Sequence, residues 1–170
     1  MRNVAWVMVG WIGVVFWSAV CSRLHVSHLM PDAAVVTVVF LGLRREPLLV
    51  TFTALALGYL AGRECVAPVG LHETALVACA LGVYLASGAL TGSGPWFFAA
   101  VSGGAAMGYH LVLFLLLLAF RGTAGFPGWW TAVLLPSGLA TAFLALVSYA
   151  GLTALERRLA TDRHEALSWR

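Results

Sequence analysis

The sequence contains no lysine and no glutamine, and asparagine occurs only once, as Asn3. Charged residues make up 10% of the 170 positions, whereas about a quarter of the residues in a soluble domain are charged. Hydrophobic residues make up 61%, and the mean hydropathy is +0.92. This composition excludes a water-soluble surface and predicts an all-α polytopic membrane protein. We expect one transmembrane domain over residues 1–155 and a short charged cytoplasmic tail over 156–170.

The motifs of several function classes are also missing. The ten arginines form no long basic tract, so the sequence does not favour a nucleic-acid partner. The three cysteines show no Cys-x-x-Cys spacing and are interpreted as packing residues, without a metal or cofactor. Ser93 lies in a predicted turn, 17 residues before His110. If the helix between them is continuous, the two residues are about 25 Å apart, too far for a catalytic serine–histidine pair. We therefore predict no enzymatic activity.

Six apolar segments are candidates for membrane helices. Crossing about 30 Å of hydrocarbon takes roughly 20 helical residues, and four segments meet this length: Val4–Ser22, Glu73–Leu90, Trp96–Phe120 and Trp129–Leu155. The other two, Ala33–Leu43 and Pro47–Ala61, would be only about 17 and 22 Å long as helices. The sequence thus predicts a six-helix transmembrane bundle with short helices 2 and 3.

The distribution of arginine predicts the orientation of this bundle. Placing the N-terminus and the C-terminus on the cytoplasmic side puts seven arginines inside and three outside, as the positive-inside rule requires. The first apolar segment is expected to remain as a helix, since Val20 before Cys21 does not suit signal cleavage. We expect a multi-pass protein of the bacterial cytoplasmic (inner) membrane.

Most of the other polar residues gather near the outer leaflet under this topology. They include Asp32, Glu64, His72 and Glu73, together with His25 and His28. A metal site would need His25, His28 and Asp32 on one helical face. Pro31 is expected to begin helix 2, which leaves both histidines in the preceding loop. We therefore predict an interfacial polar network here and no metal site.

His110 is predicted to lie near the middle of the fifth helix, where an ionisable side chain is costly and usually faces the bundle interior. A role in transport or proton movement and a neutral imidazole bonded to a neighbouring helix are both open. No nearby position in the sequence supplies a carboxylate partner.

Gly104 and Gly108 form a Gly-x-x-x-Gly pair in the same helix, and Ala100 extends it by one turn. Small residues four positions apart allow two helix backbones to approach closely. Two interpretations remain open, namely packing inside the bundle and a docking face for the single helix of a partner.

A group of motifs between residues 31 and 90 resembles the MreD family of rod shape-determining membrane proteins. The resemblance lies in Pro31-Asp32, in the segment Leu41–Pro47 with its Arg44-Arg45 pair, in Leu57–Leu60, and in Pro68–His72. One position departs from the family pattern. Family members usually carry an aspartate at the end of the third segment, where this chain has Gly62-Arg63-Glu64.

The resemblance implies a non-enzymatic membrane subunit of the bacterial cell elongation complex, which builds lateral peptidoglycan. The implied partners are an MreC-like single-helix protein and, directly or through it, a RodA-type polymerase, a penicillin-binding transpeptidase and MreB filaments. The implied fold is similar to that of the substrate-binding S-subunits of energy-coupling-factor transporters. A subunit of such a vitamin or metal transporter is therefore the alternative function.

These expectations lead to a docking hypothesis. Short helices 2 and 3 would leave a lipid-facing groove that a partner helix fills, with Gly104 and Gly108 as contacts and the Arg44-Arg45 turn fixing the cytoplasmic register.

Overall fold

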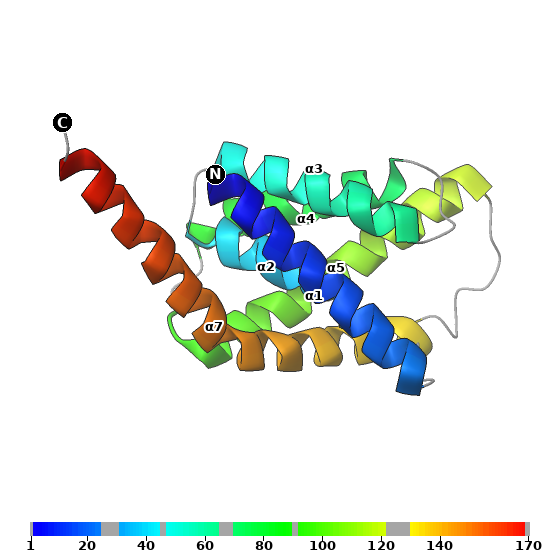
Figure 1. The fold of residues 1–170 in the computed structure, drawn as a ribbon. Coiled ribbons are helices and arrows are strands. Elements are labelled where there is room, and N and C mark those ends of the chain that lie inside the picture. Colours follow the sequence, from blue (N-terminus) through cyan, green and yellow to red (C-terminus); the bar gives the residue numbers. More distant parts are fainter. Residues whose placement is uncertain are drawn as a thin grey trace.

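The computed structural model describes residues 2–24, 31–44, 47–64, 70–89, 92–121 and 130–168, which form helices and no strand. The chain runs through α1 (Arg2–Leu24), α2 (Ala33–Gly42), α3 (Pro47–Glu64), α4 (Leu71–Ser87), α5 (Pro95–Arg121), a short π-helical turn η2 (Trp130–Leu134) and α7 (Leu135–Ser168). Figure 1 shows these helices gathered side by side, with the last part of α7 extending away from the others. The prediction of an all-helical chain is confirmed for these residues.

Several helix bounds differ from the prediction. α3 continues three residues beyond the predicted end, to Glu64, and α4 runs from Leu71 to Ser87, two positions before the predicted start and three before the predicted end. Pro31 and Asp32 precede α2 instead of beginning it, because the Asp32 carboxylate accepts a hydrogen bond from the Val35 backbone N–H at 3.1 Å and caps the helix. The last helix continues through the predicted tail to Ser168.

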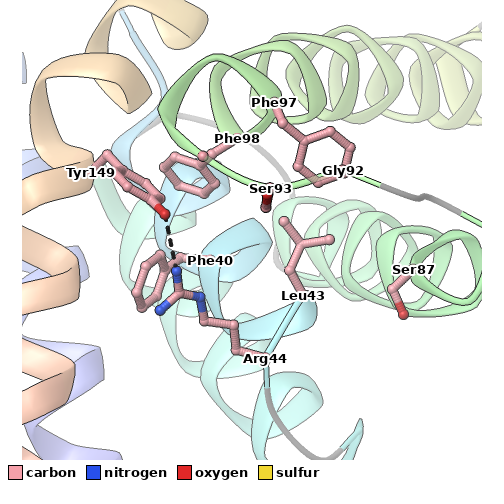
Figure 2. Close-up of a pocket in the computed structure, with 10 residues that line it drawn as sticks. Phe40, Leu43, Arg44, Ser87, Gly92, Ser93, Phe97, Phe98 and Tyr149 are labelled. Carbon is pink, nitrogen blue, oxygen red and sulfur yellow. Dashed lines mark hydrogen bonds between the residues drawn. The ribbon is translucent and has the colours of Figure 1, made fainter.

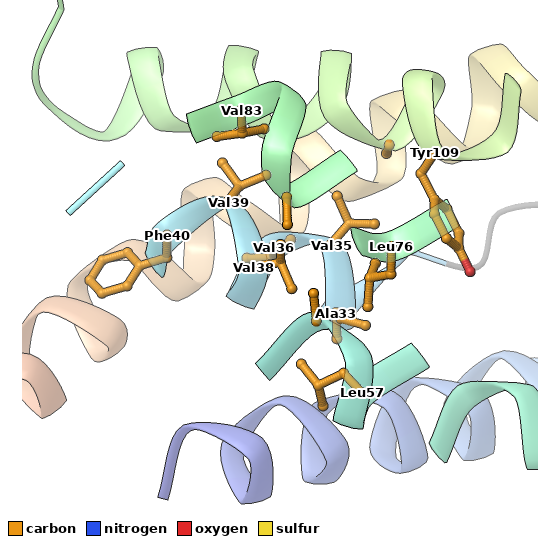
Figure 3. Packing of buried hydrophobic residues seen from close by; sticks show 14 of the residues in the cluster. Ala33, Val35, Val36, Val38, Val39, Phe40, Leu57, Leu76, Val83 and Tyr109 are labelled. Carbon is orange, nitrogen blue, oxygen red and sulfur yellow. The ribbon is translucent and has the colours of Figure 1, made fainter. Parts of the chain in front are cut away.

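The short helix α2 lies at the centre of the structure, where Figure 3 shows its side chains packed among the other helices. All ten of its residues are buried, and it contacts α1, α3, α4, α5 and α7. The segment has no polar face, and the hydroxyl of its single threonine, Thr37, donates to the Ala33 carbonyl within the helix. The predicted lipid-facing groove beside helix 2 is therefore wrong, since the burial of all ten residues leaves no face of α2 open to lipid.

The outer helices, in contrast, expose large apolar side chains. On α3, Leu48 and Phe52 are 72% and 70% exposed, and on α7, Phe143 and Val147 are 67% and 65% exposed. Exposed apolar faces of this kind also occur on α1, α4 and α5. Two helical stretches, Pro95–Phe120 and Ala132–Arg158, are long and apolar enough to cross a membrane.

The two ends of α2 mark opposite ends of the bundle. At its start, the backbone N–H of Asp32 donates to the Thr141 hydroxyl of α7 at 3.0 Å. Just after its end, Arg44 pairs with Glu156 of α7. We refer to these as the Asp32 end and the Arg44 end. The N-terminus and the C-terminus lie on the same side of the bundle in Figure 1.

Candidate functional site

A polar cluster occupies the Asp32 end and contains Asp32, His72, Glu73, Tyr109 and His110; we call it the Asp32 cluster. His72 Nδ1 and the Tyr109 hydroxyl are 2.7 Å apart in a hydrogen bond that joins α4 to α5. Asp32 interacts electrostatically with both His72 and His110. Within the fold the charge of Asp32 thus acts on His110, although no position near His110 in the sequence supplies a carboxylate.

Two buried atoms of this cluster have no hydrogen-bond partner among the described residues, namely Glu73 Oε2 and His110 Nε2. Glu73 lies beside α3, where a Cβ added to Gly62 would be 3.8 Å from its Oε2 atom. Buried polar atoms without partners are uncommon and call for a water, an ion or a ligand group.

Part of the predicted polar network can be located among the described residues. His72 interacts electrostatically with Asp32 and Glu73, so three of the predicted residues lie together. The side chain of Glu64 and the residues His25 and His28 lie outside the described part of the chain. Within that part, no three His, Cys, Asp or Glu side chains group as ligands of a metal ion.

A second feature is a pocket of about 230 Å³ at the Arg44 end, which we call the Arg44 pocket. Figure 2 shows Arg44 on one side of the pocket and aromatic rings from α2, α5 and α7 around it. Ser87, at the end of α4, and Ser93, just before α5, also line it. The Arg44 guanidinium lies 4.7 Å from the centre of the Phe40 ring, donates to the Tyr149 hydroxyl at 3.3 Å and pairs with Glu156. These contacts hold the cation in one place.

The turn before α5 forms the opposite wall of the Arg44 pocket, and glycine is required twice in it. Gly94 has φ of 100°, which side chains rarely allow, and it is followed by Pro95 at the first position of α5. A Cβ at Gly92 would lie 2.3 Å from the Phe97 ring. The sequence places Ser93 in a turn correctly, but it does not indicate a pocket, because Arg44, Ser87 and Ser93 come from three separate segments.

A third feature is an apolar groove of about 320 Å³ between α4 and α5, which we call the α4–α5 groove. Ala78, Gly82 and Ala86 line it from α4 at intervals of four residues, and Gly108 lines it from α5. The Cys79 thiol donates to the Ala105 carbonyl at 3.5 Å and joins the two helices there. Small residues thus leave the backbones of both helices accessible along the groove.

The glycine pair predicted from the sequence faces outward. Gly104 and Gly108 are exposed, and a Cβ added at either would meet nothing within 4 Å. The neighbouring Gly103 makes the close helix crossing instead, since its Cβ would lie 3.0 Å from Ala142 and 3.1 Å from the Gly138 carbonyl of α7. Internal packing is therefore the wrong interpretation for Gly104 and Gly108, and a docking face stays a hypothesis. Arg45, the other predicted contact, lies outside the described residues.

Comparisons of the chain with protein-family models, with curated proteins and with solved structures give no match. The arguments for function therefore come from the sequence and from the three features above.

Proposed function

We propose that this chain is a non-enzymatic, multi-pass subunit of the bacterial cytoplasmic membrane that acts as an MreD-like scaffold of the cell elongation complex. The apolar faces of α1, α3, α4, α5 and α7 support a lipid environment, because large exposed apolar side chains on so many helices are unsuited to water. The family resemblance of residues 31–90 supports the link to cell elongation. In this proposal the outer helices cross the bilayer and α2 is enclosed by them.

The observation that carries the proposal is the open stripe of small residues beside the α4–α5 groove. Ala100, Gly104 and Gly108 are exposed at intervals of four on α5, and Gly108 lines the same groove as Ala78, Gly82 and Ala86 of α4. In lipid, helices associate through close van der Waals packing, which small residues permit. The proposed occupant is the single membrane helix of an MreC-like protein, and RodA-type polymerase, penicillin-binding transpeptidase and MreB filaments would join through it or directly.

Leucine at Gly104 or Gly108 tests the docking. The side chain would project from an open surface, so the fold should persist while the partner helix is excluded. We expect either variant, tagged at the C-terminus and extracted from its native host in mild detergent, to lose the single-helix partner at an unchanged melting temperature. Gly151→Leu is the matched control, since Gly151 is also exposed with nothing within 4 Å and lies on α7.

Retention of the partner by both variants would contradict docking in this groove. Unfolding of either variant would contradict the open surface on which the proposal depends.

The transporter alternative is favoured by one observation, the unpartnered Glu73 Oε2 and His110 Nε2 atoms of the Asp32 cluster. Such atoms suit the polar part of a ligand-binding site. The same purification distinguishes the two functions. A pair of cytoplasmic ATPases with a transmembrane coupling subunit would favour the transporter, whereas a single-helix protein with a RodA-type polymerase would favour the scaffold.

A further inference from the structure

The Arg44 pocket is the cavity that best matches a defined ligand chemistry. Arg44 is the charged residue of its lining, and the Arg44 side chain is 33% exposed. A guanidinium has five N–H donors, and the contacts with Glu156 and Tyr149 use two of them. The remaining N–H groups of Arg44 are available to a ligand. Phe40, Tyr149 and Glu156 already hold the guanidinium in position, so ligand binding would not have to order a flexible side chain.

The remaining polar groups of the pocket favour an anion. Ser93 is exposed on the turn before α5, and Ser87, whose hydroxyl donates to the Tyr84 carbonyl at 2.6 Å, lies at the end of α4. The 27-residue helix α5 begins at Pro95 beside the pocket, so its positive dipole end adds to the charge of Arg44. Gly94, with φ of 100°, gives the turn before α5 the left-handed backbone conformation that occurs in anion-binding turns.

Two further arginines, Arg157 and Arg158, follow Glu156 on the exposed surface of α7. The surrounding rings of Phe40, Phe97, Phe98 and Tyr149 are apolar and suit the part of a ligand that lies next to its anionic group. This combination is typical of the boundary between acyl chains and headgroups.

We propose that the Arg44 pocket binds a phosphate group, and specifically the phosphodiester of an anionic lipid headgroup at the cytoplasmic face. Arg44 would pair with the phosphate oxygens, the Ser93 hydroxyl would donate to them, and the aromatic rings would contact the glycerol and the first part of the acyl chains. The site rests on the membrane placement in the proposed function but not on any partner helix. Loss of partner docking and loss of lipid binding would therefore be separate results.

The test uses the full chain, delipidated in detergent, with titration of phosphatidylglycerol followed by native mass spectrometry. Diacylglycerol with the same acyl chains is the probe without phosphate, and glycerol 3-phosphate is the soluble source of the same group. We expect one saturable phosphatidylglycerol molecule, little diacylglycerol binding, and affinity that falls as salt increases. Binding of glycerol 3-phosphate but not of phosphatidylglycerol would assign the pocket to a soluble phosphoester and overturn the lipid source.

Substitutions in the pocket test whether the lipid binds there. Arg44→Gln should weaken phosphatidylglycerol binding by about tenfold, the effect of losing one good charge-assisted contact. Arg158→Gln is the matched control, because it removes an exposed arginine at the same end that does not line the pocket. Equal losses in both variants would mean diffuse attraction to a basic surface and would overturn the site.

A second pair of variants avoids the structural contacts of Arg44. Ser93 is exposed, so Ser93→Asp should leave the melting temperature unchanged while its carboxylate repels the phosphate and reduces binding at least as much as Arg44→Gln. Asparagine is similar in size to aspartate but neutral, so Ser93→Asn should bind phosphatidylglycerol as the original chain does. Unchanged binding by Ser93→Asp, or equal binding of diacylglycerol, would overturn the proposal even if Arg44→Gln failed to fold.

Discussion

Arg44 and Glu156, which are 112 positions apart in the sequence, form an ion pair that ties the end of α2 to α7. Their side chains are 33% and 18% exposed, so solvent screens the pair partially. Arg44 also contacts Tyr149 of α7 and Phe40 of α2. One side chain therefore joins the enclosed helix to the longest helix of the fold.

Unequal effects are expected when the two members of this pair are changed. Glu156→Gln should cost at most about 1 kcal/mol of unfolding free energy, as for other partly exposed pairs. Arg44→Gln should cost more, because it also loses the Tyr149 hydrogen bond and the stacking on Phe40. A double-mutant cycle, measured by denaturant unfolding in detergent, gives the interaction free energy between Arg44 and Glu156. Equal costs for the two single variants would show that the ion pair alone accounts for the role of Arg44.

The crossing of α3 and α4 should depend on Gly58. A Cβ at this position would lie 2.6 Å from the Cα atom and 3.0 Å from the backbone N of Glu73, and a backbone cannot move aside as a side chain can. We expect Gly58→Ala to lower the unfolding free energy by about 1–3 kcal/mol. Gly151→Ala, on an open face, should be neutral or stabilising by up to about 1 kcal/mol. Thermal unfolding of both variants compares them, and a stable Gly58→Ala protein would refute the close crossing.

If Asp32 acts as the cap of α2, replacing it by alanine should lower stability more than replacing it by asparagine. Asp32→Ala removes the acceptor for the Val35 N–H and should cost about 1 kcal/mol, whereas Asp32→Asn keeps a good capping oxygen. Helix content and melting temperature, measured by circular dichroism, report the difference. Equal damage from both changes would mean that the carboxylate charge facing His72 and His110 matters more than the cap.

The hydrogen bond between His72 and Tyr109 should contribute measurably to stability, because Tyr109 is buried and 4% exposed. Tyr109→Phe should lower the unfolding free energy by about 1 kcal/mol, the usual net value for one such bond. Tyr84→Phe is the control, since the Tyr84 side chain is 37% exposed. A melting temperature that falls equally in both variants would contradict a specific role for the Tyr109 hydroxyl.

Trp6 anchors α1 against the enclosed helix. It is fully buried, and its ring centre lies 5.5 Å from that of Phe40. Trp6→Ala should cost about 3–5 kcal/mol because it leaves a large cavity. Trp6→Phe should cost much less, since it keeps most of the ring and removes a buried indole N–H that has no partner among the described residues. Unfolding that is equally early in both variants would mean that the indole N–H is required.

The local features of this protein follow well from its sequence. The uninterrupted apolar segments predicted where helices would form, and Pro47 marked where α3 begins. The start of α2 was misplaced by two residues, since Pro31 was expected to begin the helix that Asp32 caps from outside. The ends of α3 and α4 were misplaced by two or three residues, since polar residues such as Arg63 and His72 can continue a helix without changing its apolar character.

Which face of each helix is buried could be determined only from the tertiary structure. In an all-apolar helix the sequence carries no periodic signal to separate an enclosed side from an outer one, so nothing in residues 33–42 showed that α2 is central. The same limit hid the difference between Gly103, which packs against α7, and Gly104, which is open. Asp32 near His110 and Arg44 beside Ser87 and Ser93 depend on helices far apart in the chain. Composition and hydropathy therefore determined the helical class, and helix packing alone decided which residues share a site.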